Sequence, residues 1–160
     1  MTTNPLLDAR VADAHDLPLL EALATIAYDE AHPTRGGRLL LEHDYENASG
    51  RERLQASLDG ADAGLWCGTV DEVPVGYASA ALADRGGIRV AMIDTLFVHP
   101  DARGIGVAAE LLERVRSWAL DAGAQALESQ VLPGNRDAKN FFERTGMITR
   151  QMRVSMDLVD

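Results

Sequence analysis

The spacing of apolar and polar residues divides the chain into segments with helical and strand-like patterns. From Asp16 towards Tyr28, leucines recur at helical spacing (Leu19, Leu20 and Leu23), which predicts a helix that the Asp16 side chain can cap. A short apolar stretch before this helix predicts an initial strand. The region from His32 to Leu58 is less regular, and we expect a loop, a polar connection and a short second helix there.

The middle of the chain has the pattern of antiparallel strands. LWCGTV and VPVGYASAAL lie on either side of the polar pair Asp71-Glu72, which predicts a hairpin, and RGG at 85–87 predicts the next turn. IRVAMIDTLFV then predicts a long strand from Ile88 to Val98, which Pro100 helps to end because proline cannot donate a ladder hydrogen bond.

From Gly104 onward the apolar period becomes helical. One helical face carries Val107, Leu111, Val115 and Trp118, and Gly123 is expected to stop this helix in a left-handed conformation. ALESQV predicts a further strand, and AKNFFERTG predicts a short helix that ends at Gly146. We expect the tail from Met147 to Leu158 to be extended and to complete the sheet.

This order of elements predicts an α/β (α+β) fold in one domain that spans residues 1–160. A mixed, mostly antiparallel sheet would be flanked by helices, and VAMIDTLFV, the following helix and ALESQV would form a parallel crossover. In such sheets ligands bind at the carboxyl ends of strands, which directs attention to the segment that follows Val98.

Composition narrows the classes of function. The 160 residues carry a net charge of −10, which argues against nucleic acid as a partner and favours cationic molecules. The single cysteine and the absence of a Cys/His spacing predict neither a disulfide nor a metal site. With no signal peptide and no apolar stretch long enough for a bilayer, we expect a soluble, cytoplasmic protein that does not contact membranes.

The segment FVHPDARGIGVAAELLERV places Arg103, Gly104 and Gly106 directly before a helix. A helix N-terminus attracts phosphate through its unpaired N–H groups, and glycine lets the phosphate approach the backbone closely. The segment therefore predicts a pyrophosphate cradle; an ordinary glycine-rich helix start with a solvated arginine is the alternative. GIGVAA also fits the loose dinucleotide fingerprint, but five residues separate it from the strand, and no Gly-Lys-Ser/Thr of a P-loop occurs.

RGIGVA at 103–108 matches Arg/Gln-x-x-Gly-x-Gly/Ala, with LFVHP before it and NRDAKNFFERTGM about thirty residues later. Together these motifs resemble the GNAT superfamily of N-acetyltransferases. The resemblance implies that acetyl-CoA is the acetyl donor, that no metal takes part, and that main-chain groups hold the donor. The implied donor-binding residues are Leu96, Phe97, Val98, Arg103, Gly104, Ile105, Gly106, Val107, Ala108, Asn135 and Asn140. The amide near Phe97 or Val98 would polarise the thioester carbonyl. Each asparagine has the alternative of being a helix cap or a solvated residue.

For the catalytic groups the sequence gives alternative candidates instead of one motif. The family often has a tyrosine, credited with protonating the leaving thiolate, where this chain has Phe142, for which core packing is the favoured role. Simple alternation places Asp94 on the apolar face of its strand, so Asp94 is a candidate general base; a bulge there would shift the phase. Glu128 is the alternate base. The variable acceptor wall of the family would include Tyr28, Glu30, His32 and Tyr45.

These expectations combine into an N-acetyltransferase that moves an acetyl group from acetyl-CoA to a primary amine of a small molecule or peptide, by direct attack in a ternary complex. A non-catalytic acyl-CoA-binding or regulatory domain is the alternative that Phe142 suggests, and a small dinucleotide-binding protein is a third. An extended C-terminal strand could also pair between two chains and form a homodimer.

Overall fold

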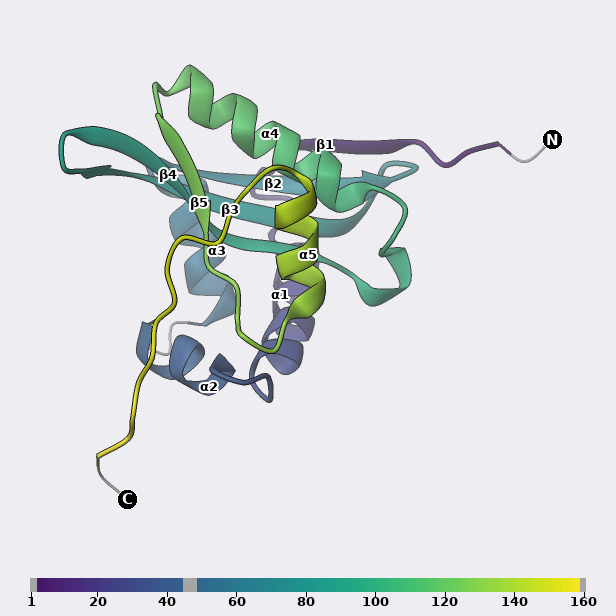
Figure 1. The fold of residues 1–160 in the computed structure, drawn as a ribbon. Coiled ribbons are helices and arrows are strands. Elements are labelled where there is room, and N and C mark those ends of the chain that lie inside the picture. The colour runs from purple at the N-terminus through teal and green to yellow at the C-terminus, as the bar shows by residue number, and fades with distance from the viewer. Residues whose placement is uncertain (1–2, 45–48, 159–160) are drawn as a thin grey trace.

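The structure is a computed structural model that describes residues 3–44 and 49–158. Within these residues there are five strands, five helices and two short helical turns, one π-helical and one 3-10 (Figure 1). In chain order the elements are β1 (Leu7–Val11), α1 (Leu17–Ala31), α2 (Gly37–Leu39), the π-helical turn (Leu40–Asp44), α3 (Gly50–Asp59), β2 (Ala63–Val70), β3 (Val73–Arg85), β4 (Ile88–Val98), the 3-10 turn (Pro100–Ala102), α4 (Val107–Asp121), β5 (Ala126–Ser129) and α5 (Arg136–Arg144).

The strands form one sheet in the order β1-β2-β3-β4-β5, which confirms the predicted fold class. The first four strands are antiparallel neighbours, whereas β5 runs parallel to β4 after the crossover through α4. The turn between β2 and β3 places Asp71 and Glu72 at positive φ, 47° and 69°, as a tight two-residue hairpin requires. The predicted hairpin is therefore confirmed. The expectation of a single domain over 1–160 stays a prediction.

Helices cover both faces of the sheet (Figure 1). On one face α4 packs against β1 to β4, and its buried Val107, Leu111 and Val115 form a cluster with Phe142 of α5. On the other face α1 and α3 contact each other and the sheet, and the cluster there contains Leu20, Leu54 and other buried residues. The two clusters fix the helices that flank β4 on opposite sides.

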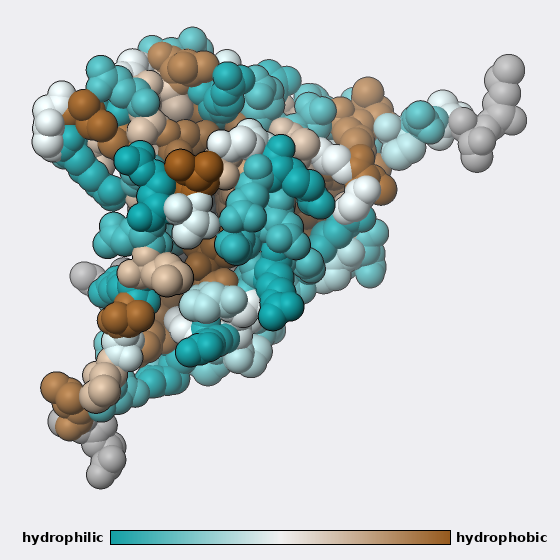
Figure 2. All heavy atoms as spheres, viewed as in Figure 1, coloured by the Kyte–Doolittle hydropathy of each residue, from teal (hydrophilic) through white to brown (hydrophobic). Residues whose placement is uncertain are grey.

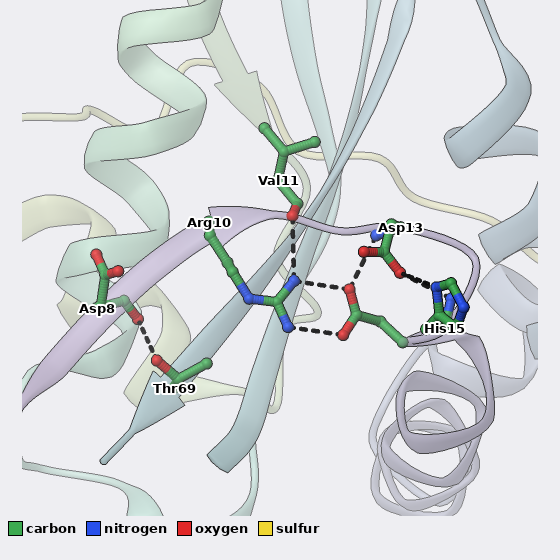
Figure 3. A network of polar contacts seen from close by, with 7 residues as sticks. Asp8, Arg10, Val11, Asp13, His15 and Thr69 are labelled. Carbon is green, nitrogen blue, oxygen red and sulfur yellow. Dashed lines mark hydrogen bonds and ion pairs between the residues drawn. The ribbon is translucent and has the colours of Figure 1, made fainter. Parts of the chain in front are cut away.

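The start of α1 is built differently from the prediction. The Asp16 side chain makes no capping hydrogen bond; both of its oxygens instead accept hydrogen bonds from the guanidinium of Arg10 on β1, each at 2.7 Å (Figure 3). Asp16 also accepts a hydrogen bond from the N–H of Asp13 at 2.8 Å. The prediction that Asp16 caps the helix was wrong because an ion pair with Arg10, which the sequence spacing does not reveal, holds its carboxylate.

Two further predictions need correction. The segment after His32 was expected to be a loop and a polar connection, but residues 37–44 are helical. The tail was expected to complete the sheet, but residues 147–158 form no strand and are exposed almost throughout. In Figure 1 this tail runs past β5 and α3 and ends beyond α2. Alternating polar and apolar residues predict that a segment can pair as a strand, but they do not predict which sheet edge it pairs with.

A bulge interrupts β4 at Asp94. Thr95 lies opposite Ser79 and Ile93 lies opposite Ala80, so Asp94 is the extra residue. Because a bulge reverses the alternation, Ile93, Leu96 and Val98 all join the cluster under α4. The prediction that simple alternation places Asp94 on the apolar face of its strand was therefore wrong, and the alternative of a bulge is confirmed.

Candidate functional site

The sheet opens between β4 and β5. The two strands pair over four residues only, from Val90 opposite Ala126 to Ile93 opposite Ser129. β4 continues to Val98, and in the described chain no strand pairs with this last part on the β5 side. An extended ligand with amide groups could bind this open edge as an additional strand would.

The bulge determines which peptide groups face the open edge. On the β5 side, Arg89 and Ile93 accept hydrogen bonds through their carbonyl oxygens from Gln125 N–H at 2.8 Å and Ser129 Oγ at 3.4 Å. The N–H of His99 donates in the other direction, to Val75 of β3. Since the N–H and C=O of one residue point the same way and alternate along a strand, Val98 faces the open edge and Phe97 faces β3.

The turn after β4 presents free donors. Gly104 and Gly106 have φ of 81° and 114°, and Gly106 is the N-cap of α4 with no capping side chain. Backbone N–H groups on either side are bonded within the turn or helix, but the described residues provide no acceptor for the N–H groups of residues 104–108. These N–H groups carry partial positive charge and lie at the start of a 15-residue helix. The position is therefore favourable for an anionic phosphate.

Gly104 and Gly106 are required for their backbone conformation and not because a side chain would lack space. A Cβ on Gly104 would have nothing within 4 Å, and a Cβ on Gly106 would lie 3.2 Å from Leu7 Cδ1, the end of a flexible side chain. Both residues nevertheless adopt left-handed φ values that other residues rarely adopt. The turn therefore needs glycine in order to aim its N–H groups.

Arg103 connects the turn to two other elements. Its Nε donates to the Val98 carbonyl at 2.9 Å, its Nη2 lies 2.7 Å from Glu30 Oε2 at the end of α1, and its guanidinium lies 5.4 Å from the Phe97 ring centroid. The side chains of Arg103 and Glu30 are both about half exposed. A phosphate at the turn would compete with Glu30 for this guanidinium.

Of the two candidate bases, Asp94 lies at the beginning of the open edge. Although Asp94 is solvent-exposed, the surrounding protein displaces enough water from its carboxyl to raise its pKa, and the charge of Arg53 on α3 opposes this shift. Arg53 also donates to Thr95 Oγ1 at 3.3 Å. Glu128 lies opposite Met92, before the strands separate, and its carboxylate is 2.9 Å from Arg85 Nη1. Sequence reasoning missed Arg53, because nothing in the pattern of α3 indicates which strand it reaches.

Three of the expected acceptor-wall residues gather at the end of α1. The rings of Tyr28 and His32 stack with centroids 5.6 Å apart, and His32 Nε2 lies 3.3 Å from Glu42 Oε1. Glu30 pairs with Arg103, as described above. Tyr45 lies outside the described residues. The ion pair between Glu30 and Arg103 therefore connects these expected wall residues to the glycine turn.

On α5, Asn135 Oδ1 accepts a hydrogen bond from the N–H of Ala138 at 3.1 Å and caps the helix, while Asn140 is exposed. Phe142 is buried and packs edge-on against Phe141 with centroids 5.3 Å apart, which confirms its predicted role as a core aromatic.

Cys67 lies in the core below α1, and burial raises the pKa of its thiol to about 12. A thiol in this state is a poor nucleophile at neutral pH. Within residues 3–44 and 49–158, no three His, Cys, Asp or Glu side chains are grouped so that they could hold a metal ion. None of the helices in those ranges combines the length and the apolar character that crossing a bilayer requires.

Comparison with known proteins agrees with this geometry. The family model described as Acetyltransferase (GNAT) family matches residues 22–147. Similar solved structures include a tetramutant of the BH1408 protein from Bacillus halodurans, with 23% identity, a TM-score of 0.74, and coverage of 94% of this chain and 99% of that one. A second is the aminoglycoside N-acetyltransferase AAC(6')-Iy in complex with CoA, with 20% identity, a TM-score of 0.72, and coverage of 99% of both chains.

A third similar structure is the ribosomal-protein-alanine N-acetyltransferase from Brucella melitensis biovar Abortus 2308. It is 17% identical, with a TM-score of 0.71 and coverage of 96% of this chain and 100% of that one. No curated protein sequence matches the chain. At these identities the solved structures establish the fold, and the family model establishes the family.

Proposed function

This chain belongs to the acetyltransferase (GNAT) family and is an acetyl-CoA-dependent N-acetyltransferase, and we propose that it transfers the acetyl group directly to a primary amine while donor and acceptor are bound together. The observation that carries the proposal is the open edge of β4. It runs from the carboxylate of Asp94 at one end to the unpaired N–H groups of residues 104–108 at the other.

On the donor side, the N–H groups of residues 104–108 fit a pyrophosphate, with the Arg103 guanidinium beside them, since the N–H of Arg103 itself donates to the Pro100 carbonyl. The edge from Leu96 to Val98 fits the amide-containing arm of coenzyme A. The bound donor supplies a thioester whose carbonyl is the electrophile. The N–H of Val98, which faces the open edge, would polarise that carbonyl and stabilise the developing negative charge. Asn135 and Asn140 would line the donor side from α5.

On the acceptor side, Asp94 would remove the proton that an alkylammonium carries at neutral pH. With an amine pKa of about 10.4, the neutral form costs roughly 4.6 kcal/mol at pH 7, so a nearby base is useful. The raised pKa of Asp94 makes its carboxylate a stronger base. Glu128 remains the second candidate for the base, although its ion pair with Arg85 directs its carboxylate towards the turn between β3 and β4.

Tyr28, Glu30 and His32 would form the acceptor wall, with Tyr45 as a further member, and the acidic side chains there favour a cationic amine. Phe142 cannot protonate the departing thiolate. A thiol pKa of about 8.5 makes that thiolate a tolerable leaving group near neutrality, so a proton from water suffices. No covalent enzyme intermediate is required, and Cys67 is too deeply buried to form one.

The experiment is an acceptor screen with acetyl-CoA that measures released thiol over polyamines, amino acids, aminoglycosides and peptides with an N-terminal alanine. The last two classes are included because two of the similar structures carry those activities in their names. We expect turnover with at least one cationic primary amine. Tight binding of acetyl-CoA without turnover on any acceptor would contradict the proposal.

The donor site is tested separately with a matched pair of variants, Gly106→Ala and Gly123→Ala. Both residues have positive φ, 114° and 77°, and lie at opposite ends of α4, so both variants should lose similar stability. Only Gly106→Ala should weaken CoA binding in a calorimetric titration, by about tenfold or more, because only it re-aims the N–H groups. Equal affinities for the two variants would refute the cradle.

A further inference from the structure

The side chain of Arg103 folds back onto the open edge of β4. Its backbone N–H donates to the Pro100 carbonyl at 3.3 Å within the turn, whereas its Nε reaches back five residues and donates to the Val98 carbonyl at 2.9 Å. The peptide group of Val98 faces the open edge, so an added strand or a strand-like ligand would pair with this carbonyl. Arg103 therefore already engages a carbonyl that the amide-containing arm of a donor would use.

Two further contacts hold the guanidinium in this position. Its Nη2 lies 2.7 Å from Glu30 Oε2 at the end of α1, and its Cζ lies 5.4 Å from the centroid of the Phe97 ring on β4. Each contact is modest by itself, because an ion pair between half-exposed side chains contributes little and an exposed cation–π contact is similarly weak. Together with the hydrogen bond to Val98 they favour one position of a long side chain, between α1 and the edge of β4.

A pyrophosphate at the glycine turn offers the guanidinium a stronger partner than Glu30. Phosphate carries more charge than a carboxylate and can accept two parallel N–H bonds from a guanidinium. The N–H groups of residues 104–108, which have no acceptor in the described chain, would hold that phosphate directly after Arg103. When Arg103 turns to the phosphate, the Val98 carbonyl and the Glu30 carboxylate both become available.

A thioester without a pyrophosphate has no group that draws Arg103 away from the edge. It has to compete with the arginine for the Val98 carbonyl, and the surface nearby offers it little apolar contact in exchange. On α5, which flanks the proposed donor side, most side chains are exposed and hydrophilic, as Figure 2 shows in the view of Figure 1. Binding of the arm therefore depends on the backbone groups of the edge.

We propose that Arg103 is a specificity-determining residue, which closes the edge of β4 to thioesters that lack a pyrophosphate and opens it when a pyrophosphate binds at the turn. The inference rests on the donor site proposed above and gives Arg103 a second role, the exclusion of short thioesters such as those of pantetheine. The two halves of the donor are then coupled, because binding of either half favours the same displaced position of Arg103.

The test measures the two halves separately, with pantetheine and inorganic pyrophosphate as probes and without an acceptor. In an NMR titration of the wild type, saturating pyrophosphate should strengthen pantetheine binding about fivefold, the scale of one hydrogen bond. Arg103→Ala should bind pantetheine about fivefold more tightly than the wild type does, and pyrophosphate should add nothing further. The same variant should bind CoA about tenfold more weakly, because the pair between guanidinium and phosphate is lost. Opposite signs for the two ligands distinguish an occluding side chain from general damage to the site.

Two further variants complete the test. Arg114→Ala removes the same charge from α4, where Arg114 Nη2 lies 3.2 Å from Asp8 Oδ1, and should leave the affinity for pantetheine unchanged. Glu30→Gln keeps Arg103 but loosens it, so it should strengthen pantetheine binding about two- to threefold, even if Arg103→Ala disturbs the turn.

The outcomes separate this role of Arg103 from the donor site itself. A wild type that does not bind CoA would disprove the donor site and the role of Arg103 together. If CoA binds, the role of Arg103 alone is overturned when Arg103→Ala leaves pantetheine affinity unchanged or lowers it. It is also overturned when pyrophosphate leaves the binding of pantetheine to the wild type unchanged.

Discussion

Replacing Asp16 with asparagine should reveal how much the ion pair with Arg10 contributes to stability. Both carboxylate oxygens lie 2.7 Å from the Arg10 guanidinium, and the Asp16 side chain is only 9% exposed (Figure 3). The hydrogen bonds from Arg10, opposed by burial and assisted by the Asp13 N–H, lower the pKa of Asp16 from 3.8 to about 2. The pair joins β1 to the start of α1, the helix that ends at the proposed acceptor wall.

The expected magnitude follows from that pKa. A difference of about 1.8 pKa units at 1.36 kcal/mol per unit corresponds to about 2 kcal/mol of stability at neutral pH. Arg10 is 44% exposed, so the loss should fall below the 3 to 5 kcal/mol typical of a fully buried pair that is broken. For a chain of this size, about 2 kcal/mol lowers Tm by roughly 4 to 8 °C.

The sign of the pH dependence is fixed as well. Because the folded pKa lies below the unfolded value, the stabilisation is fully present above about pH 4 and disappears as the pH falls through 2. Urea unfolding of wild type and Asp16→Asn should therefore differ by about 2 kcal/mol at pH 7 and converge near pH 2. Asp29→Asn is the control, since Asp29 is exposed and makes no ion pair within the described chain. A gap that stays constant with pH, or a control that behaves like Asp16→Asn, would refute the reasoning.

Two further predictions concern the site, and a third concerns the core. Glu30→Gln should strengthen CoA binding up to about fivefold, because Arg103 loses a half-exposed competitor worth at most about 1 kcal/mol; weaker binding in a calorimetric titration would contradict this. Asp94→Asn should lower kcat/KM at neutral pH by about a hundredfold and remove the acidic limb of its pH profile. That limb should be shifted upwards from the ordinary pKa of an aspartate, because the surrounding protein displaces water from the Asp94 carboxyl and raises its pKa; an unchanged limb would assign the base elsewhere. Cys67 should resist thiol reagents at pH 8 until the protein is unfolded, because its pKa is raised to about 12, and rapid labelling of the folded protein would contradict its burial.

The sequence predicts those parts of the fold that local pattern determines. The hairpin at Asp71-Glu72, the helix after Gly106 and its stop at Gly123 all follow from turn chemistry and apolar period, and all are present. Apart from the helical residues 37–44, the errors concern contacts between one element and another. The ion pair that takes Asp16 away from the helix end joins two elements, and the free tail depends on which edge is available, so neither has a local signal.

The same division applies to the site. The glycine turn is recognisable because left-handed φ values restrict the residue type, and the structure places its unpaired N–H groups at a helix start. The bulge at Asp94 is different, because no residue type is required there and only the pairing with Ser79 and Ala80 reveals it. The contact from Arg53 to Thr95 is invisible for the same reason, since it depends on how α3 lies across β4.

The bulge and the opening of the sheet act together on the open edge. Without the extra residue, alternation from Ile93 would turn Thr95 and Phe97 towards that edge, and the peptide group of Val98 would face β3. With it, Val98 faces the edge, its carbonyl accepts from Arg103, and its N–H remains available beside the phosphate turn. Leu96 and Val98 also pack under α4, so the orientation of these peptide groups is coupled to the core. The groups proposed to hold and polarise the donor are therefore backbone atoms positioned by one inserted residue and two glycines. This explains why the proposed donor site has a recognisable sequence, whereas the proposed acceptor wall, built from side chains at the end of α1, does not.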